Sequence, residues 1–179
     1  MDEDDFIWNM FDDEFMDLAV GGTVQEIMDY HSAYGVNYGI SDYHFWTTLM
    51  CSARWNQDPA VTHFFISAGV RIEARDDKGR TALLHAAENN PNPEVLKVLI
   101  RAGSDVNASD WQGWTALMHA ASNNPNPEVI KALLAAGADA TAKDADGKTA
   151  LDYAEENEKI KGTDAYQTLN DAYWKQRDR

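Results

Sequence analysis

A repeat of 34 residues constrains this chain more than any other feature of its sequence. Residues 76–109 and residues 110–143 align without a gap and are identical at 21 of 34 positions. Both copies contain the string Asn-Asn-Pro-Asn-Pro-Glu-Val, which begins at Asn89 and again at Asn123. Such a repeat builds one supersecondary unit several times, and the units must stack because a single unit cannot bury its apolar side alone. We therefore expect a solenoid.

The period extends beyond these two copies. Glycines recur at a spacing of 34 residues near both ends of each unit, at Gly79, Gly113 and Gly147 and at Gly35, Gly69, Gly103 and Gly137. We predict a repeat domain over 13–179 with units at about 13–41, 42–75, 76–109, 110–143 and 144–179. The first and last units are expected to cap the stack with polar outer sides.

Each unit is predicted to contain two short helices joined by the repeated string. Asn89 and Asn90 tolerate the left-handed conformation that would end the first helix, and Pro91 prevents its continuation. Asn92 is expected to cap the second helix, with Pro93 at its first position. In the first unit, Thr23 and Glu26 have the spacing of a capping box.

Residues 1–12 form an acidic and aromatic extension. Five apolar side chains would share one face of a helix that continues into the first unit: Ile7, Met10, Phe11, Phe15 and Leu18. We expect this face to seal the first unit, and the alternative is a segment that binds a partner.

The sequence resembles the ankyrin repeats. The likeness lies in Asp-x-x-Gly-x-Thr-Ala-Leu at Asp76, Asp110 and Asp144, in Glu-Val-x-x-x-Leu at Glu94 and Glu128, and in Ala-Gly-x-Asp at Ala102 and Ala136. It covers roughly residues 13–154. The resemblance implies an all-α solenoid whose hairpin-like fingers and first helices line a concave face. His85 and His119 lie one position after the family's turn-stabilising histidine, so we expect them not to take over its hydrogen bonds.

The resemblance also implies which positions face outward and are free to bind. Nine residues at these positions are our candidate partner-binding residues: Tyr43, His44, Trp46, Trp55, Lys78, Arg80, Trp111, Gln112 and Trp114. Tryptophan and tyrosine anchor protein interfaces because they bury a large area with little loss of side-chain entropy. The alternative for Trp46 and Trp114 is that they fold back over neighbouring fingers.

The charge of the chain is strongly negative, with a formal net charge of -15 at pH 7. A field of this sign repels phosphate backbones and anionic lipid surfaces, so we expect neither nucleic-acid nor membrane binding and consider a basic protein the natural partner. The alternative is that the charge only keeps a monomer soluble. Acidic residues at the N-terminus and the lack of an apolar run of about 20 residues favour the cytoplasm.

No arrangement of residues indicates catalysis. The five histidines show no ligand spacing, the finger aspartates are explained by turn chemistry, and Cys51 is expected to be packed. We predict no cofactor and no metal. The favoured function is a non-enzymatic module that binds a protein on its concave face. The alternatives are an acidic inhibitor or immunity-type protein that neutralises a basic enzyme or toxin, a structural subunit, and an unrecognised enzyme.

Overall fold

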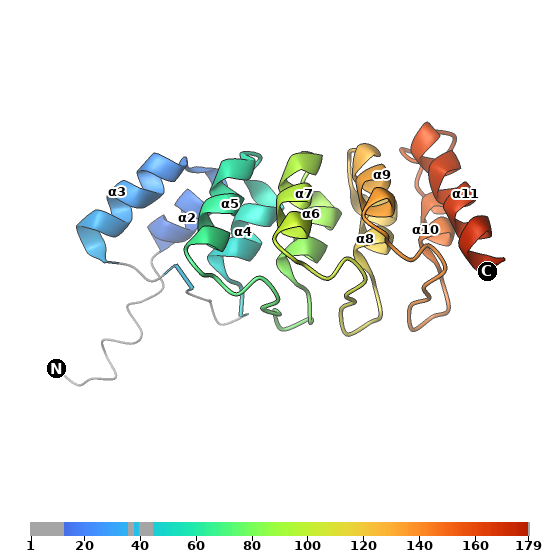
Figure 1. Ribbon diagram of the computed structural model, residues 1–179, viewed down its shortest axis with the longest axis horizontal. Coiled ribbons are helices and arrows are strands. Elements are labelled where there is room, and N and C mark those ends of the chain that lie inside the picture. The colour runs from blue at the N-terminus through green and yellow to red at the C-terminus, as the bar shows by residue number, and fades with distance from the viewer. Residues whose placement is uncertain (1–12, 36–37, 40–44, 179) are drawn as a thin grey trace.

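The computed structural model describes residues 13–35, 38–39 and 45–178 as a single row of stacked helix pairs (Figure 1). Within these residues, the first helices of the pairs are α2 (Asp13–Gly21), α4 (Thr48–Trp55), α6 (Ala82–Asn89), α8 (Ala116–Asn123) and α10 (Ala150–Glu156). The second helices are α3 (Val24–Tyr34), α5 (Pro59–Ser67), α7 (Pro93–Arg101), α9 (Glu128–Ala135) and α11 (Asp164–Arg177). Each predicted unit contains one pair.

The pairs are held together by a core that repeats with the sequence. First helices pack on first helices, and second helices on second helices, from α2 and α3 to α10 and α11. The same apolar position is buried in all five first helices, at Phe15, Leu49, Leu83, Leu117 and Leu151. An equivalent valine is buried at the start of three second helices, Val61, Val95 and Val129. The apolar side of every unit is therefore covered by its neighbours, as expected for a stack.

The all-α prediction is confirmed. Between consecutive pairs from the second to the fifth, the chain makes hairpin-like fingers, which project from the lower edge of the stack in Figure 1. An isolated antiparallel bridge pairs Ser109 with Thr115 in these fingers. Glycines with positive φ angles shape the finger turns, among them Gly79 at 79° and Gly113 at 83°.

The corner between the two helices differs in one respect from the prediction. Asn89 is the last residue of α6, and Asn90 is extended with φ -79° and ψ 119°, so the left-handed conformation predicted for this pair is wrong. The predicted cap is confirmed, because the Asn92 side chain accepts a hydrogen bond from the backbone N–H of Glu94 at 3.0 Å and Pro93 begins α7. The capping box of Thr23 and Glu26 is also present.

The extended conformation of Asn90 is explained by its buried side chain. Its Nδ2 donates to the backbone carbonyls of Ala53 and Asn56 in the preceding unit, at 2.9 Å each, and its Oδ1 accepts from the N–H of Asn92. Asn124 makes the same bonds to Ala87 and Asn90 one unit later. A buried carbonyl without a partner costs free energy, so this asparagine ladder stabilises each junction between units.

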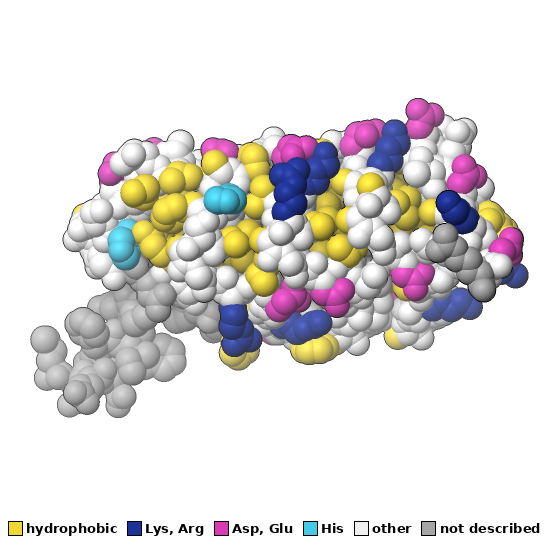
Figure 2. All heavy atoms as spheres, in the orientation of Figure 1, with side chains coloured by type: hydrophobic (Ala, Val, Ile, Leu, Met, Phe, Trp, Pro, Cys, Tyr) yellow, Lys and Arg dark blue, Asp and Glu magenta, His cyan; other side chains and the backbone are white. Residues whose placement is uncertain are grey.

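The second helices form the outer side of the stack, which Figure 2 shows. Hydrophobic side chains are exposed over α3 and α5, where a hollow of about 280 Å³ is lined by Met28, His31 and Phe64 among others. No helix among the described residues is long and apolar enough to cross a membrane.

The prediction for the N-terminal extension falls largely outside the described residues. This is the case for residues 1–12, including Ile7, Met10 and Phe11. Of the other side chains assigned to that face, Phe15 is buried and Leu18 is partly buried against the core. The sealing role of the extension stays a prediction.

Candidate functional site

The fingers of the third, fourth and fifth units are each tied to the first helix of their own unit by a buried aspartate. In the third unit, Asp76 Oδ1 accepts from the N–H groups of Lys78 and Arg80 at 2.9 and 2.8 Å, which closes the finger turn. The other carboxylate oxygen, Oδ2, lies 3.0 Å from Nε2 of His85 on α6. This aspartate therefore has two roles, because it closes the finger turn and also ties the finger to α6.

This contact between the finger aspartate and a side chain of the first helix, which we call the lock, recurs in the next two units. His119 Nε2 lies 3.1 Å from Asp110 Oδ2, and the Tyr153 hydroxyl donates to Asp144 Oδ2. We expected His85 and His119 not to take over the hydrogen bonds of the family's histidine, and their own bonds to the finger aspartates were not predicted. They stand one position later than the histidine of the family pattern, yet from the first helix they reach the finger aspartate.

A cluster of aromatic and charged side chains surrounds His85. Arg54 on α4 donates from Nη1 to Glu88 at 2.6 Å and approaches Nδ1 of His85 at 3.3 Å. Because a guanidinium has only donors, Nδ1 must be the acceptor, and the imidazole proton is on Nε2, where it donates to Asp76. The ring of Trp46 lies 4.2 Å from that of His85, centroid to centroid.

In this cluster, two arginines make cation–π contacts with the tryptophan rings. The guanidinium carbon of Arg54 lies 5.7 Å from the ring centroid of Trp46 and 5.2 Å from that of Trp55, within the range of a cation–π contact. Arg80 lies on Trp46 at 5.9 Å and reaches Glu88 at 3.4 Å. Glu88 therefore pairs with both arginines, and both guanidinium groups lie against the ring of Trp46.

The electrostatics of the lock follow from its burial. Burial alone would raise the pKa of Asp76, but the hydrogen bonds from His85 and the Arg80 backbone and the nearby positive charge outweigh it and hold the pKa well below its usual range. Burial lowers the pKa of His85, and the charges of Arg80 and Arg54 lower it further against the opposing hydrogen bond to Asp76. An ionised aspartate and a neutral histidine therefore make the lock at neutral pH.

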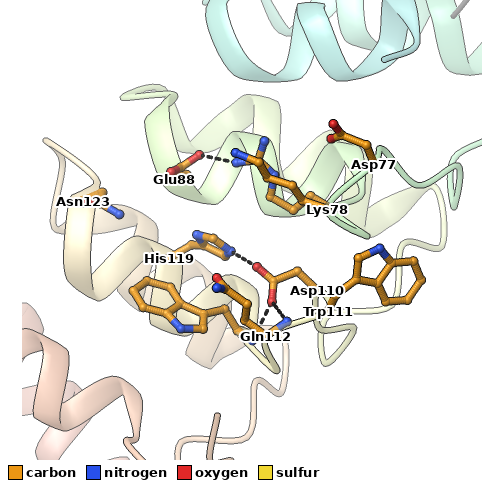
Figure 3. Close-up of a pocket in the computed structure, with 10 residues that line it drawn as sticks. Asp77, Lys78, Glu88, Asp110, Trp111, Gln112, His119 and Asn123 are labelled. Carbon is orange, nitrogen blue, oxygen red and sulfur yellow. Dashed lines mark hydrogen bonds and ion pairs between the residues drawn. The ribbon is translucent and has the colours of Figure 1, made fainter. Parts of the chain in front are cut away.

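Two adjoining hollows lie over this framework on the side of the fingers and first helices. The larger, of about 490 Å³, lies between the third and fourth units (Figure 3). Its lining includes Glu88 and Asn123 from the helices and Trp111 and Gln112 from a finger. The smaller, of about 410 Å³, is lined by residues from three units: Met16, Asp17, Val20, Trp46, Cys51, Trp55, Asp77, Lys78 and Arg80. Asp77, Lys78 and Arg80 line both, so the hollows adjoin each other, and we call their combined lining the inner surface.

Seven of the nine candidate residues lie on this inner surface. Trp46 and Trp55 line the smaller hollow, Trp111, Gln112 and Trp114 line the larger one, and Lys78 and Arg80 stand between them. Tyr43 and His44 lie outside the described residues. Whether these side chains contact a partner stays a prediction.

The four tryptophans differ in how much of each ring is free. Trp55 is 47% exposed and Trp111 is 67% exposed. Trp46 and Trp114 are half-buried, because Trp46 packs on His85 and Trp114 lies 4.3 Å from the ring of Tyr153. Both rings therefore pack on the first helix of the next unit, whereas the alternative was that they fold back over neighbouring fingers.

Trp111 makes a close contact with the preceding finger. Its backbone N–H donates to the carbonyl of Lys78 at 3.0 Å, and a Cβ on Gly79 would lie 2.4 Å from the Trp111 ring. The guanidinium of Arg75 lies 5.3 Å from that ring's centroid. One face of the indole is thus fixed on the finger, and the rest projects into solvent.

Sequence reasoning missed three residues of this arrangement, namely Arg54, Glu88 and Asn123. Arg54 and Glu88 are one repeat length apart and opposite in charge, which is a signal that they meet across the junction between two units. Asn123 belongs to the repeated string and was assigned to the helix corner, although its exposed side chain lines the larger hollow.

The described residues contain no group of three or more histidine, cysteine, aspartate or glutamate side chains that could hold a metal ion. His119, which lines the inner surface, and the buried His85 are both hydrogen-bonded to finger aspartates. The polar groups of the inner surface are therefore arranged to hold fingers and arginines in place.

Comparison with known proteins places the chain in a family. The model for ankyrin repeats, in three copies, matches residues 15–110 and again residues 84–169. A search of curated proteins found no match. Ankyrin repeats are generally protein–protein interaction modules and typically not enzymes. The two matches together span most of the chain and agree with the stacked helix pairs and fingers, and the protein belongs to the ankyrin-repeat family.

Proposed function

We propose that this protein is a binding module that receives a segment of a partner protein along its inner surface, with Trp55 and Trp111 as anchors. The segment would lie across both hollows, from the second unit to the fourth. An extended or helical segment of another protein suits these hollows better than a small molecule does, because both are open and they adjoin each other along the stack.

The exposure of the two anchors carries this proposal. The residues that correspond to Trp55 in the next two units are Asn89 and Asn123, and those that correspond to Trp111 are Asp77 and Ala145. The fold is built equally well with small or polar side chains at these positions, so packing does not require the tryptophans. Exposed tryptophans beside arginines are the composition of interface hot spots.

A second candidate is an inhibitor that neutralises a basic enzyme or toxin. The observation that favours it is the net charge of -15, together with a hollow of about 450 Å³ at the end of the stack where Asp146, Asp152, Glu155 and Glu156 outnumber Lys148 and Lys161. Such a field would speed association with a basic protein. In this case the captured partner would be an enzyme whose activity falls on binding.

The experiment uses a photo-crosslinking amino acid at Gln112, which lines the larger hollow, and at Gln25, an exposed glutamine of α3 on the outer side. Both variants are irradiated in an extract of the native cells, and crosslinked proteins are identified by mass spectrometry. We expect a protein that is captured from Gln112 and not from Gln25. Capture from Gln25 alone, or equally from both, contradicts binding at the inner surface.

A further inference from the structure

The cluster around Arg54 has a second copy two units later in the stack. Four of its members correspond at a spacing of 68 residues: Trp46 with Trp114, Arg80 with Lys148, His85 with Tyr153, and Glu88 with Glu156. The correspondence is geometric as well. The Trp46 and His85 rings are 4.2 Å apart at an interplanar angle of 46°, and the Trp114 and Tyr153 rings are 4.3 Å apart at 45°.

The ion pair of the cluster is also repeated. Arg80 Nη1 lies 3.4 Å from Glu88 Oε2, and Lys148 Nζ lies 2.9 Å from Glu156 Oε1. In both copies the cation comes from the finger and the carboxylate from the last turn of the next first helix, α6 or α10. The two copies therefore present the same arrangement of a tryptophan face, a second ring and a carboxylate.

The second copy lacks the arginine. In the first copy, Arg54 lies over Trp46 and donates to Glu88 at 2.6 Å. The corresponding residue of the second copy is Ser122, a short, uncharged side chain near the end of α8. Among the described residues, no other arginine or lysine takes the place that Arg54 has in the first copy.

The surroundings of the second copy favour a positive charge. The side chain of Glu156 is 65% exposed, whereas that of Glu88 is 19% exposed. Glu156 borders the hollow of about 450 Å³, where four carboxylates, those of Asp146, Asp152, Glu155 and Glu156, outnumber the two ammonium groups of Lys148 and Lys161. The existing bond to Lys148 does not prevent a second cation from binding, because Glu88 accepts from both Arg54 and Arg80.

We propose that the second copy is a binding site for an arginine side chain of the partner, whose guanidinium stacks on Trp114 and pairs with Glu156 in the way that Arg54 stacks on Trp46 and pairs with Glu88. The inference rests on the proposed function and adds that the bound segment continues beyond the larger hollow to the fifth unit and carries an arginine there. Arginine is favoured over lysine because a planar guanidinium can stack on an indole and donate to a carboxylate at the same time.

The test uses N-acetyl-arginine amide as the probe, with N-acetyl-citrulline amide as a neutral analogue of the same shape. Binding is followed by NMR through the indole N–H signal of Trp114, which is assigned by its loss in Trp114→Phe. We expect a saturable shift with the arginine probe and an affinity at least about fivefold lower for the citrulline probe. Equal responses to the two probes would overturn the inference, as would no response to the arginine probe.

Two pairs of variants locate the probe. Glu156→Gln should weaken binding by about threefold or more, whereas Glu158→Gln, an exposed carboxylate in the same segment, should leave it unchanged. Ser122→Arg should fill the site from within and abolish the Trp114 response. Ser32→Arg makes the same exchange on exposed α3 and should preserve the response. If Ser122→Arg is folded and still binds the probe as the parent does, the site is not at Ser122 and the inference is wrong.

The outcome is separable from that of the crosslinking experiment, because the probe is a free amino-acid amide. Binding of the probe without capture of a protein from Gln112 would contradict the proposed function and leave the arginine site standing. Capture from Gln112 without probe binding would support the proposed function and overturn the arginine site.

Discussion

The side-chain Nδ2 of Asn124 lies 2.8 Å from the carbonyl oxygen of Ala87, one unit earlier in the stack. The same nitrogen lies 3.0 Å from the carbonyl oxygen of Asn90, and both contacts are buried. One side chain therefore satisfies two backbone carbonyls that belong to the neighbouring unit. This ladder is the reason why the repeated string contains a second asparagine.

Replacing Asn124 should destabilise the protein far more than replacing its neighbour. In Asn124→Ala, two buried carbonyls lose their donor and the turn to Asn126 loses its acceptor, so we expect a loss of about 2–4 kcal/mol in the free energy of unfolding. Asn123→Ala removes an exposed side chain of the same type and should change it by less than about 0.5 kcal/mol. Urea denaturation measures both. Equal losses in the two variants would show that the ladder does not stabilise the junction.

The lock between His85 and Asp76 predicts a pH dependence of stability. The folded protein resists protonation of His85, whose pKa is lowered by burial and by nearby arginines, whereas the unfolded chain takes up this proton below about pH 6.5. The stability that neutral His85 provides is therefore full above this pH and is lost as the pH falls. Asp76, whose pKa is also lowered, adds a further loss only below about pH 4.

The measurement compares unfolding at pH 7 and pH 5 in the parent and in His85→Gln. We expect the parent to lose up to about 2 kcal/mol more than the variant over this interval. His63→Gln, which changes an exposed histidine of α5, should keep the slope of the parent. If His85→Gln and the parent have the same slope, proton uptake at His85 does not distinguish the folded from the unfolded state.

Phe45 provides a test of backbone strain. It has φ 61° at the finger position where the following units carry Gly79, Gly113 and Gly147, and it is 62% exposed. A side chain other than glycine in this region costs about 1–2 kcal/mol. Phe45→Gly should therefore raise the free energy of unfolding by about 1 kcal/mol, offset in part by the greater freedom of glycine in the unfolded chain.

The control for this change is Phe45→Ala, which removes the ring and keeps the Cβ atom. Thermal unfolding should show a higher midpoint for Phe45→Gly than for Phe45→Ala and the parent. A glycine variant that is no more stable than the alanine variant would mean that the positive φ angle is not a source of strain.

The fold was predictable because the repeat fixes both the helices and their faces. Leu49, Leu83 and Leu117 recur at the repeat length, so their burial in successive first helices follows from the period alone. The caps at Asn92 and Thr23 were recognised from local chemistry that depends on neighbouring residues only. Features that depend only on residues within one repeat, such as caps and buried positions, can therefore be predicted from a single copy.

The parts that were missed depend on contacts between units. Asn90 was assigned to a left-handed turn because its reach to Ala53 and Asn56 in the preceding unit is not visible in one copy. The bond of His85 to Asp76 was discounted because the histidine is displaced from the family position. The half-burial of Trp46 and Trp114 depends on which ring, His85 or Tyr153, the next unit supplies.

The most direct test of the central claim is the affinity for the partner identified by crosslinking, measured by isothermal titration calorimetry. Trp55→Ala combined with Trp111→Ala should raise the Kd by about 30-fold or more, which corresponds to about 2 kcal/mol. Trp174→Ala is the matched control, because Trp174 is 48% exposed on α11, away from the inner surface. Its Kd should stay within about twofold of that of the parent. If the folded double variant binds as tightly as the parent, or if Trp174→Ala weakens binding as much, the inner surface is not where this protein receives its partner.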